Sequence, residues 1–180
     1  MVNEGVSAVA IDPSVDGKCD ARIAATWAVL DTVLDPEVPA LSIRDLGIVR
    51  DVILADDGGA IEVVLTPTYS GCPATEVISG DVHAAIDAAG LGPARVTLRR
   101  APAWTTDWIS AAGRIKLQAY GIAPPGPVAE QVVHFRPRAL ACPRCGSRQT
   151  EQLSAFGTTA CKAIWRCLAC QEPFEHFKPL

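Results

Sequence analysis

The most specific chemistry in this sequence lies in its last third, where four of the seven cysteines form two CxxC pairs. A stretch of 21 residues separates the two pairs. Two close pairs of thiolates are the ligand set of a tetrahedral zinc site, because each CxxC turn places two sulfurs on one side of the ion. The spacing therefore predicts one structural Zn²⁺ with four ligands: Cys142, Cys145, Cys167 and Cys170.

Other uses of these four thiols fit the pattern less well. Free buried thiols are disfavoured by the paired spacing, and a redox CxxC belongs at a helix start in a thioredoxin-like βαβ unit, which this pattern does not offer. An iron centre in the same ligands is a chemical alternative. A closed four-sulfur site has no open coordination position, so we do not expect it to be catalytic.

The second candidate for chemistry is Cys72, which follows the hydroxyl-rich loop 66–71 and precedes Pro73 at a predicted helix start. A helix N-terminus offers unpaired N–H groups and a positive dipole end, which lower the pKa of a thiol. Cys72 is therefore the candidate functional thiol, as a ligand for a metal or cluster or as a nucleophile. The alternative is a half-buried capping cysteine. No base accompanies it, since His83 lies roughly three turns further along the same helix, so we predict no catalytic residue.

The remaining polar and aromatic groups receive structural interpretations. We interpret Cys161 as a small buried hydrophobic residue and Cys19 as an incidental thiol. His134 and His176 lie at no spacing that improves on the four cysteines. The segment from Trp104 to Trp108 is interpreted as core packing beside a helix cap. Acidic side chains at no metal-binding spacing are interpreted as solvated loop charges: Asp35, Glu37, Asp45 and Asp51.

Local patterns predict one α+β domain over residues 20–121, with a small mixed sheet and the order α-β-β-α-β-α. The predicted strands are a hairpin of 48–54 and 61–66, followed by 94–99. The predicted helices begin at a cap on Asp20, after Pro73, and at Thr105 or Thr106. They end at Asp35-Pro36, Gly90 and Gly121.

Three further segments complete the predicted organisation. Residues 1–19 are predicted to be a mobile tail, and residues 122–130 a proline-rich linker. Residues 131–180 are predicted to be a four-cysteine zinc ribbon, because 50 residues bury too little apolar surface to fold without a metal. We expect the linker to separate the cores of the two units.

Composition narrows the class of protein. Apolar residues make up 49% of the chain and charged residues 20%, which excludes a disordered chain, and no apolar run reaches the ~20 residues of a membrane helix. The net charge is −4, with no strongly basic run, which argues against nucleic-acid binding. No secretory signal is visible, so we expect a cytoplasmic location with reduced thiols.

Several motifs together resemble a known family. The segments that resemble the iron–sulfur-assembly domain of SufT-like proteins are 35–39, 43–49, 66–73 and 104–108. The C-terminal unit adds Phe156–Lys162 and Glu172–Phe174. Over residues 20–180 the chain resembles the PaaD family of aerobic phenylacetate degradation, in which this domain is joined to a four-cysteine unit.

The resemblance implies an accessory role in maturation of phenylacetyl-CoA epoxidase, with insertion of iron or an Fe–S cluster into a partner. It places Cys72 at the position of the reactive or cluster-binding cysteine. The implied partners are the oxygenase or reductase subunits of the epoxidase, or Fe–S assembly proteins, and the oligomeric state stays open. A transient iron or Fe–S cluster is the second expected cofactor beside Zn²⁺.

Two other classes of function remain open. The chain could be a structural adaptor of the same oxygenase that transfers no metal. It could also be an enzyme subunit in which Cys72 acts on a thioester, although the sequence supplies no base for this. It carries no paired Glu-x-x-His di-iron motif and no flavin or nucleotide fingerprint, so we do not expect the chain itself to be the oxygenase.

Overall fold

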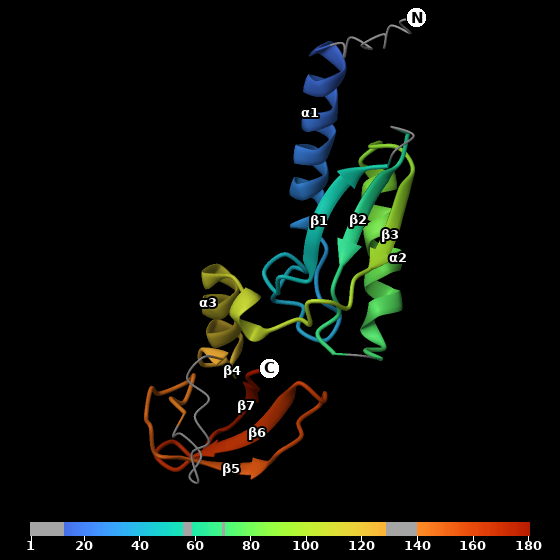
Figure 1. Cartoon of the computed structure of the whole chain (residues 1–180). Coiled ribbons are helices and arrows are strands. Elements are labelled where there is room, and N and C mark those ends of the chain that lie inside the picture. Colours follow the sequence, from blue (N-terminus) through green and yellow to red (C-terminus); the bar gives the residue numbers. More distant parts are fainter. Residues whose placement is uncertain (1–12, 56–58, 70, 129–139) are drawn as a thin grey trace, which may run out of the picture.

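The computed structural model describes residues 13–55, 59–69, 71–128 and 140–180, with side chains from Ala21 onward. The earlier strands of the chain form one small sheet and the later strands form a second, and the short helices η1 and α3 lie between the two sheets (Figure 1). The first sheet has the order β1-β2-β3 and the second the order β4-β7-β6-β5. The predicted α+β class and the order α-β-β-α-β-α are confirmed. Residues 1–12 of the predicted tail lie outside the described residues.

Helix α1 spans Pro13–Leu30, so the predicted start at Asp20 is wrong by nearly two turns. Proline suits the first turn of a helix, where its missing N–H would be unpaired, and no second proline follows within residues 14–30 to interrupt the helix. The helix also ends earlier than predicted. Both the amide and the hydroxyl of Thr32 donate to the carbonyl of Val29, at 2.9 and 2.7 Å, and close a turn there.

The first sheet matches the predicted strands closely. Strands β1 (Val49–Leu54) and β2 (Ile61–Leu65) form the antiparallel hairpin, and β3 (Ala94–Leu98) pairs with β2 in parallel. Helix α2 (Ala74–Ala88) makes the crossover between β2 and β3. Its buried residues recur every four positions and cover the sheet, which is why the sequence shows the helical period clearly: Ala74, Ile78, Val82 and Ile86.

The single helix predicted from Thr105 or Thr106 is two elements. Thr105 caps only the short helix η1 (Thr106–Trp108), and Ser110 caps a new helix, α3 (Ala111–Tyr120). The Ser110 hydroxyl accepts from the Gly113 amide at 2.8 Å, a capping bond that begins α3 after a break. Trp104 is buried, as predicted, and its indole N–H donates to the carbonyl of Leu46 at 2.9 Å.

The second sheet begins inside the segment predicted to be a linker. Strand β4 (Ile122–Ala123) pairs in parallel with β7 (Pro173–Phe177), which pairs with β6 (Lys162–Cys167) and so with β5 (Thr150–Ser154). A linker from 122 is therefore wrong at its first two residues, because their backbone completes the edge of a sheet. Residues 129–139 lie outside the described part of the chain.

The two units share one hydrophobic core, contrary to the expected separation. Cys161 and Phe177, from the second unit, belong to the main cluster of buried residues of the first unit. The ring of Phe177 lies 6.1 Å from the ring of Trp104, and the amide of Thr106 donates to the carbonyl of Leu180 at 3.2 Å. A smaller cluster around Trp165 and Phe174 fills the second unit alone.

Candidate functional site

The four paired cysteines converge on one point. Their sulfurs all lie within 4.8 Å of one another. The Sγ atoms of Cys142 and Cys170 are 3.8 Å apart, and those of Cys145 and Cys167 are 3.5 Å apart. A tetrahedral ion with metal–sulfur bonds of about 2.3 Å requires sulfurs about 3.8 Å apart. The cluster therefore fits a single metal ion, as the spacing predicted.

Backbone turns hold these thiols in place. In the first turn the amide of Gly146 donates to the carbonyl of Cys142 at 2.9 Å, with Gly146 in the left-handed region at φ 75°. In the second turn the amide of Cys170 lies 3.5 Å from the sulfur of Cys167. This amide lowers the pKa of Cys167 to about 6, because a hydrogen bond to a thiolate favours the charged form that binds metals.

Cys72 lies where the sequence placed it, immediately before Pro73, the N-cap of α2. Its carbonyl accepts from the amide of Thr75 at 3.2 Å, and its own amide donates to the carbonyl of Tyr69 at 3.3 Å. The thiol is half-buried. Burial and the hydrogen bond to Cys72 raise the pKa of Tyr69 to about 12, so the phenol keeps its proton and can donate it toward the sulfur.

Cys72 lines a small cavity with residues that lie far from it in the sequence. The cavity has a volume of about 20 Å³, and its walls include Asp35, Glu37, Cys161 and Phe177. Cys161 is 6% exposed, which agrees with the prediction of a buried thiol, and it belongs to the main cluster of buried residues, most of which come from the first unit. The structure therefore brings together two cysteines 89 positions apart in the sequence.

Asp35 and Glu37 are not the solvated charges that we predicted. Asp35 is 7% exposed, and its Oδ1 accepts from the amides of Glu37 and Val38 at 3.0 and 2.7 Å. Burial raises the pKa of Asp35 despite these two bonds. Burial, and then the charge of Asp35, raise the pKa of Glu37. The loop bends around Asp35, whose carboxylate accepts from two amides of the same loop. Asp35 and Glu37 therefore both line the cavity beside Cys72.

The positive charge that acts on the pKa values of both Asp35 and Glu37 is that of Lys162. It is almost fully buried and pairs with Glu175 through Nζ and Oε2 at 2.9 Å. Its charge lowers the pKa of both Asp35 and Glu37, yet burial outweighs it in each case. The ammonium group of Lys162 thus forms an ion pair with Glu175 and also interacts electrostatically with the carboxyl groups of Asp35 and Glu37.

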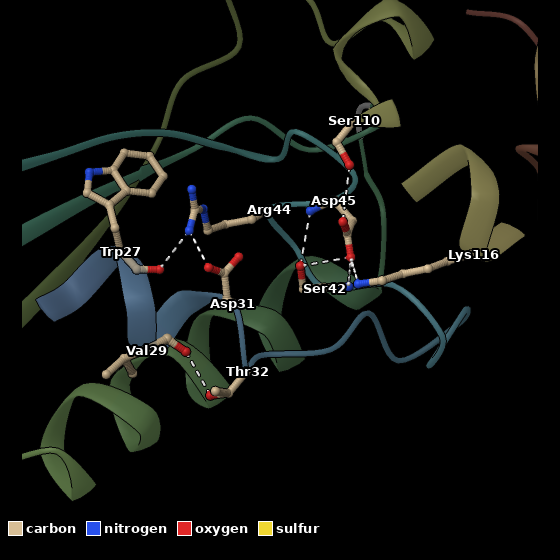
Figure 2. Close-up of polar contacts among 9 residues, drawn as sticks. All are labelled: Trp27, Val29, Asp31, Thr32, Ser42, Arg44, Asp45, Ser110 and Lys116. Carbon is tan, nitrogen blue, oxygen red and sulfur yellow. Dashed lines mark hydrogen bonds and ion pairs between the residues drawn. The ribbon is translucent and has the colours of Figure 1, made fainter. Parts of the chain in front are cut away.

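A network centred on Asp45 fixes the loop that carries the two acids (Figure 2). Its carboxylate accepts from the amide and hydroxyl of Ser42, at 3.1 and 3.2 Å, and from the hydroxyl of Ser110 at 3.1 Å. It also pairs with Lys116 at 2.6 Å. Burial raises its pKa, but the bonds from Lys116, Ser42 and Ser110 outweigh burial and leave the pKa below 3.8. Asp45 is therefore a buried anchor between the loop and α3, not a solvated charge.

Two family models match the chain. The model described as the PaaD zinc beta ribbon domain covers residues 127–178, and the model described as iron-sulfur cluster assembly protein covers residues 23–98. A curated relative from Escherichia coli (strain K12) is named as one subunit of a "Putative 1,2-phenylacetyl-CoA epoxidase". It is 48% identical over 153 residues, which are 84% of this chain and 90% of the relative. The chain belongs to the PaaD family.

Other relatives of this PaaD-family chain cover the first unit. A protein of Porphyromonas gingivalis named "Fe-S protein maturation auxiliary factor" is 32% identical over 90 residues, 49% of this chain and 84% of the relative. A crystal structure of a DUF59 domain from Bacillus anthracis aligns with a TM-score of 0.51 at 26% identity. The alignment covers 57% of this chain and 96% of that one. The predicted family resemblance is confirmed, and a structural metal at the four cysteines is supported.

The predicted site residues differ in what the structure adds to them. The four CxxC cysteines converge as expected, while Cys72 shares its cavity with Cys161, Asp35 and Glu37, which residue spacing did not indicate. The sequence did carry one indication that these residues matter, because Asp35 to Glu37 and Cys161 lie in the motifs that carried the family resemblance. His134 lies outside the described residues. None of the described helices combines the length and apolar character that crossing a membrane requires.

Proposed function

We propose that this chain is an accessory protein of the phenylacetyl-CoA epoxidase system that assists insertion of iron or an Fe–S cluster into a partner. The name of the E. coli relative supports the epoxidase system, and the names of the shorter relatives support Fe–S protein maturation. The partners in this proposal are the oxygenase or reductase subunits, or Fe–S assembly proteins. A cytoplasmic location stays a prediction.

One observation carries the maturation role. Cys72 is a half-buried thiol at a helix start and shares its cavity with Asp35 and Glu37, two acids whose pKa values are raised by burial. Such a place attracts a cation and offers it sulfur and oxygen ligands. Within this proposal Cys72 holds the metal that is delivered, and the metal is cargo rather than a resident cofactor.

The four-cysteine cluster has a different role in this proposal. We assign Zn²⁺ to Cys142, Cys145, Cys167 and Cys170, as a closed structural site. When bound, the ion cross-links the two turns of the ribbon. Because Cys161 and Phe177 of this unit complete the main core, the zinc also stabilises the cavity around Cys72.

The experiment compares the oxygenase co-expressed with this chain, with Cys72→Ser, and with Cys19→Ser, which removes a thiol from α1 instead. We expect Cys72→Ser to fold, since serine is close in size to the half-buried cysteine that it replaces, but to leave the oxygenase deficient in iron and the cells unable to grow on phenylacetate. Cys19→Ser should match the parent chain. Full iron content with Cys72→Ser would exclude metal delivery through this thiol.

A specific feature also favours the adaptor alternative. An open groove of about 550 Å³ lies at the junction of the two units, lined by residues that include Tyr120, Ile164 and Phe174, and could receive a segment of a partner. In that case Cys72→Ser would leave iron content unchanged, whereas Ile164→Glu in the groove would abolish association with the epoxidase. Measuring both iron content and association therefore separates the two functions.

A further inference from the structure

The first sheet ends in a strand whose outer edge is uncovered. The order of the sheet is β1-β2-β3, so among the described residues β3 has β2 on one side and no strand on the other (Figure 1). An open hollow of about 320 Å³ lies beside the start of β3, and its lining includes His83 and Asp87 of α2 and residues 92–94. Helix α2 therefore leaves room along this edge of the sheet.

Two hydrogen bonds define which backbone groups of β3 point outward. The amide of Ile61 donates to the carbonyl of Pro93, and the amide of Arg99 donates to the carbonyl of Leu65, both at 2.8 Å. Since alternate residues of a parallel strand bond to the same neighbour, the odd-numbered residues of β3 bond to β2. The even-numbered residues carry the N–H and C=O groups that point away from β2: Ala94, Val96 and Leu98.

These outward backbone groups are free to pair with another chain. Within the part of the chain that the structure describes, no hydrogen bond outside the pairing of β2 with β3 reaches the backbone of Ala94, Val96 or Leu98. The side chains of Ala94 and Val96 pack against the main core, which holds the strand in place. A row of free N–H and C=O groups on a fixed strand is a template for an added strand.

The side chains along this edge carry positive charge that no ion pair compensates. Arg95, Arg99 and Arg100 are exposed, and none of them forms an ion pair with any described residue. By contrast, the exposed Arg166 of the ribbon pairs with Glu151. Residues 94–100 include no acidic residue, although the net charge of the whole chain is −4. This edge therefore attracts negative charge.

The acids near β3 indicate which face of an added strand should be negative. Arg95 and Arg99 share the face of the sheet away from α2, because the residues that alternate with them pack on the core side. On that face the carboxylate of Glu62 already accepts from the hydroxyl of Thr97 at 2.9 Å. On the other side, Asp87 of α2 lines the hollow. Acidic side chains of an added strand therefore belong beside the two arginines, and apolar ones beside α2.

A second copy of this chain is a poor occupant of the edge. Two β3 strands side by side would bring the arginines of both copies together, and like charges on neighbouring strands are destabilising. An acidic strand offers the complementary charge together with the same main-chain hydrogen bonds.

We propose that the free edge of β3 binds an extended acidic segment of a partner protein, which adds to the first sheet as a fourth strand. Main-chain hydrogen bonds to Ala94, Val96 and Leu98 hold the segment, and Arg95 and Arg99 select acidic side chains at alternate positions. This interaction goes beyond the proposed function, because it requires neither metal transfer nor the thiol of Cys72.

The first test uses the full-length, zinc-loaded chain and a short capped peptide in which glutamate alternates with valine. In amide NMR spectra, the N–H groups of Val96 and Leu98 should become protected from exchange as this peptide is added, whereas that of Thr97 is protected throughout. A peptide with lysine in place of glutamate should bind at least about fivefold more weakly. The proposal fails if the glutamate peptide does not bind at millimolar concentration, leaves Val96 and Leu98 unprotected, or binds no better than the lysine peptide. It also fails if these N–H groups become protected as the concentration of the chain alone rises, because a second copy then occupies the edge.

The second test separates main-chain pairing from side-chain contact. Leu98→Pro removes an outward N–H, a change that edge strands tolerate, and Leu98→Ala keeps this N–H. Leu98→Pro should weaken binding of the glutamate peptide by at least about fivefold, the loss expected for one hydrogen bond, while Leu98→Ala should change it little. Equal losses in the two variants would show that the side chain carries the binding and would exclude strand addition.

A modified peptide keeps the test decisive if Leu98→Pro disturbs the fold. The glutamate peptide with two adjacent amides N-methylated cannot pair along either of its edges, so it should not bind the parent chain, and undiminished binding would overturn the proposal. Arg95→Gln and Arg99→Gln should each weaken binding of the unmodified peptide by about twofold or more. Arg148→Gln, which removes an exposed arginine of the ribbon, should not, and equal effects in all three variants would contradict selection by the arginines of β3.

Discussion

Replacing Asp45 should destabilise the protein far more than replacing any of its partners. The side chain is 8% exposed and accepts four hydrogen bonds, from the amide and hydroxyl of Ser42, the hydroxyl of Ser110 and the ammonium group of Lys116. Asp45→Ala removes every one of these acceptors. It leaves the amide of Ser42 buried without a partner at the start of the turn that follows Asp35 and Glu37.

The cost can be estimated bond by bond. Bonds to a carboxylate contribute about 1.5–3 kcal/mol each, and an orphaned buried donor costs a further ~1–3 kcal/mol. The Lys116 pair counts for at most about 1 kcal/mol, because that side chain is 50% exposed. Allowing for non-additivity within one network, we expect Asp45→Ala to lower the free energy of unfolding by about 4 kcal/mol. Lys116→Ala should lower it by no more than about 1 kcal/mol.

The assay is urea unfolding of the zinc-loaded chain at pH 7, followed by tryptophan fluorescence. Asp45→Asn should fall between the two other variants, since it keeps one acceptor oxygen. The folded-state pKa of Asp45 lies below 3.8, so the stabilisation by its carboxylate is complete above that pH and is lost as pH falls below it. The difference between the parent chain and Asp45→Asn should therefore narrow in strong acid. A loss for Asp45→Ala no larger than that for Lys116→Ala would refute the role of Asp45 as an anchor.

Three other predictions concern the zinc site, the pH dependence of stability and the activity of the isolated chain. Cys145→Ser should release the zinc and lower the urea midpoint of the whole chain, because Phe177 belongs to the main core; stoichiometric zinc in the variant would contradict this. Burial lowers the pKa of His176 to about 4 from 6.5. Stability should therefore decline as pH falls from 6.5 toward 4, by up to about 3 kcal/mol at about 1.4 kcal/mol per unit, and His176→Phe should remove that part of the decline in urea titrations. The isolated chain should form no epoxide from phenylacetyl-CoA, reductant and oxygen when products are measured by chromatography, and turnover would overturn the accessory role.

Local sequence patterns predicted the elements that depend on short-range chemistry. The hairpin of β1 and β2, the helix after Pro73 and the two CxxC turns each follow from turn residues, apolar period or ligand spacing within a few residues. The break between η1 and α3 was missed because Thr105 and Ser110 are both good caps. Sequence alone did not indicate which of the two begins the longer helix.

The rest depends on contacts between distant parts of the chain. No local pattern shows that Ile122 and Ala123 pair with β7, since a strand of two residues has no measurable period. Asp35 and Glu37 looked solvated because they flank a proline in a loop. They are held at the cavity by backbone amides and by a wall that the second unit supplies. The placement of Cys72 and Cys161 on one cavity is likewise a result of tertiary packing.

The shared core also has a consequence for biosynthesis. Cys161 and Phe177 are translated 89 and 105 residues after Cys72, a delay of roughly 5 to 20 seconds at ordinary rates of chain elongation. During that interval the nascent first unit carries Cys72, Asp35 and Glu37 beside an apolar surface that Phe177 has yet to cover. The first unit therefore leaves the ribosome with its cavity unfinished, and the cavity closes only when the ribbon folds back onto that unit.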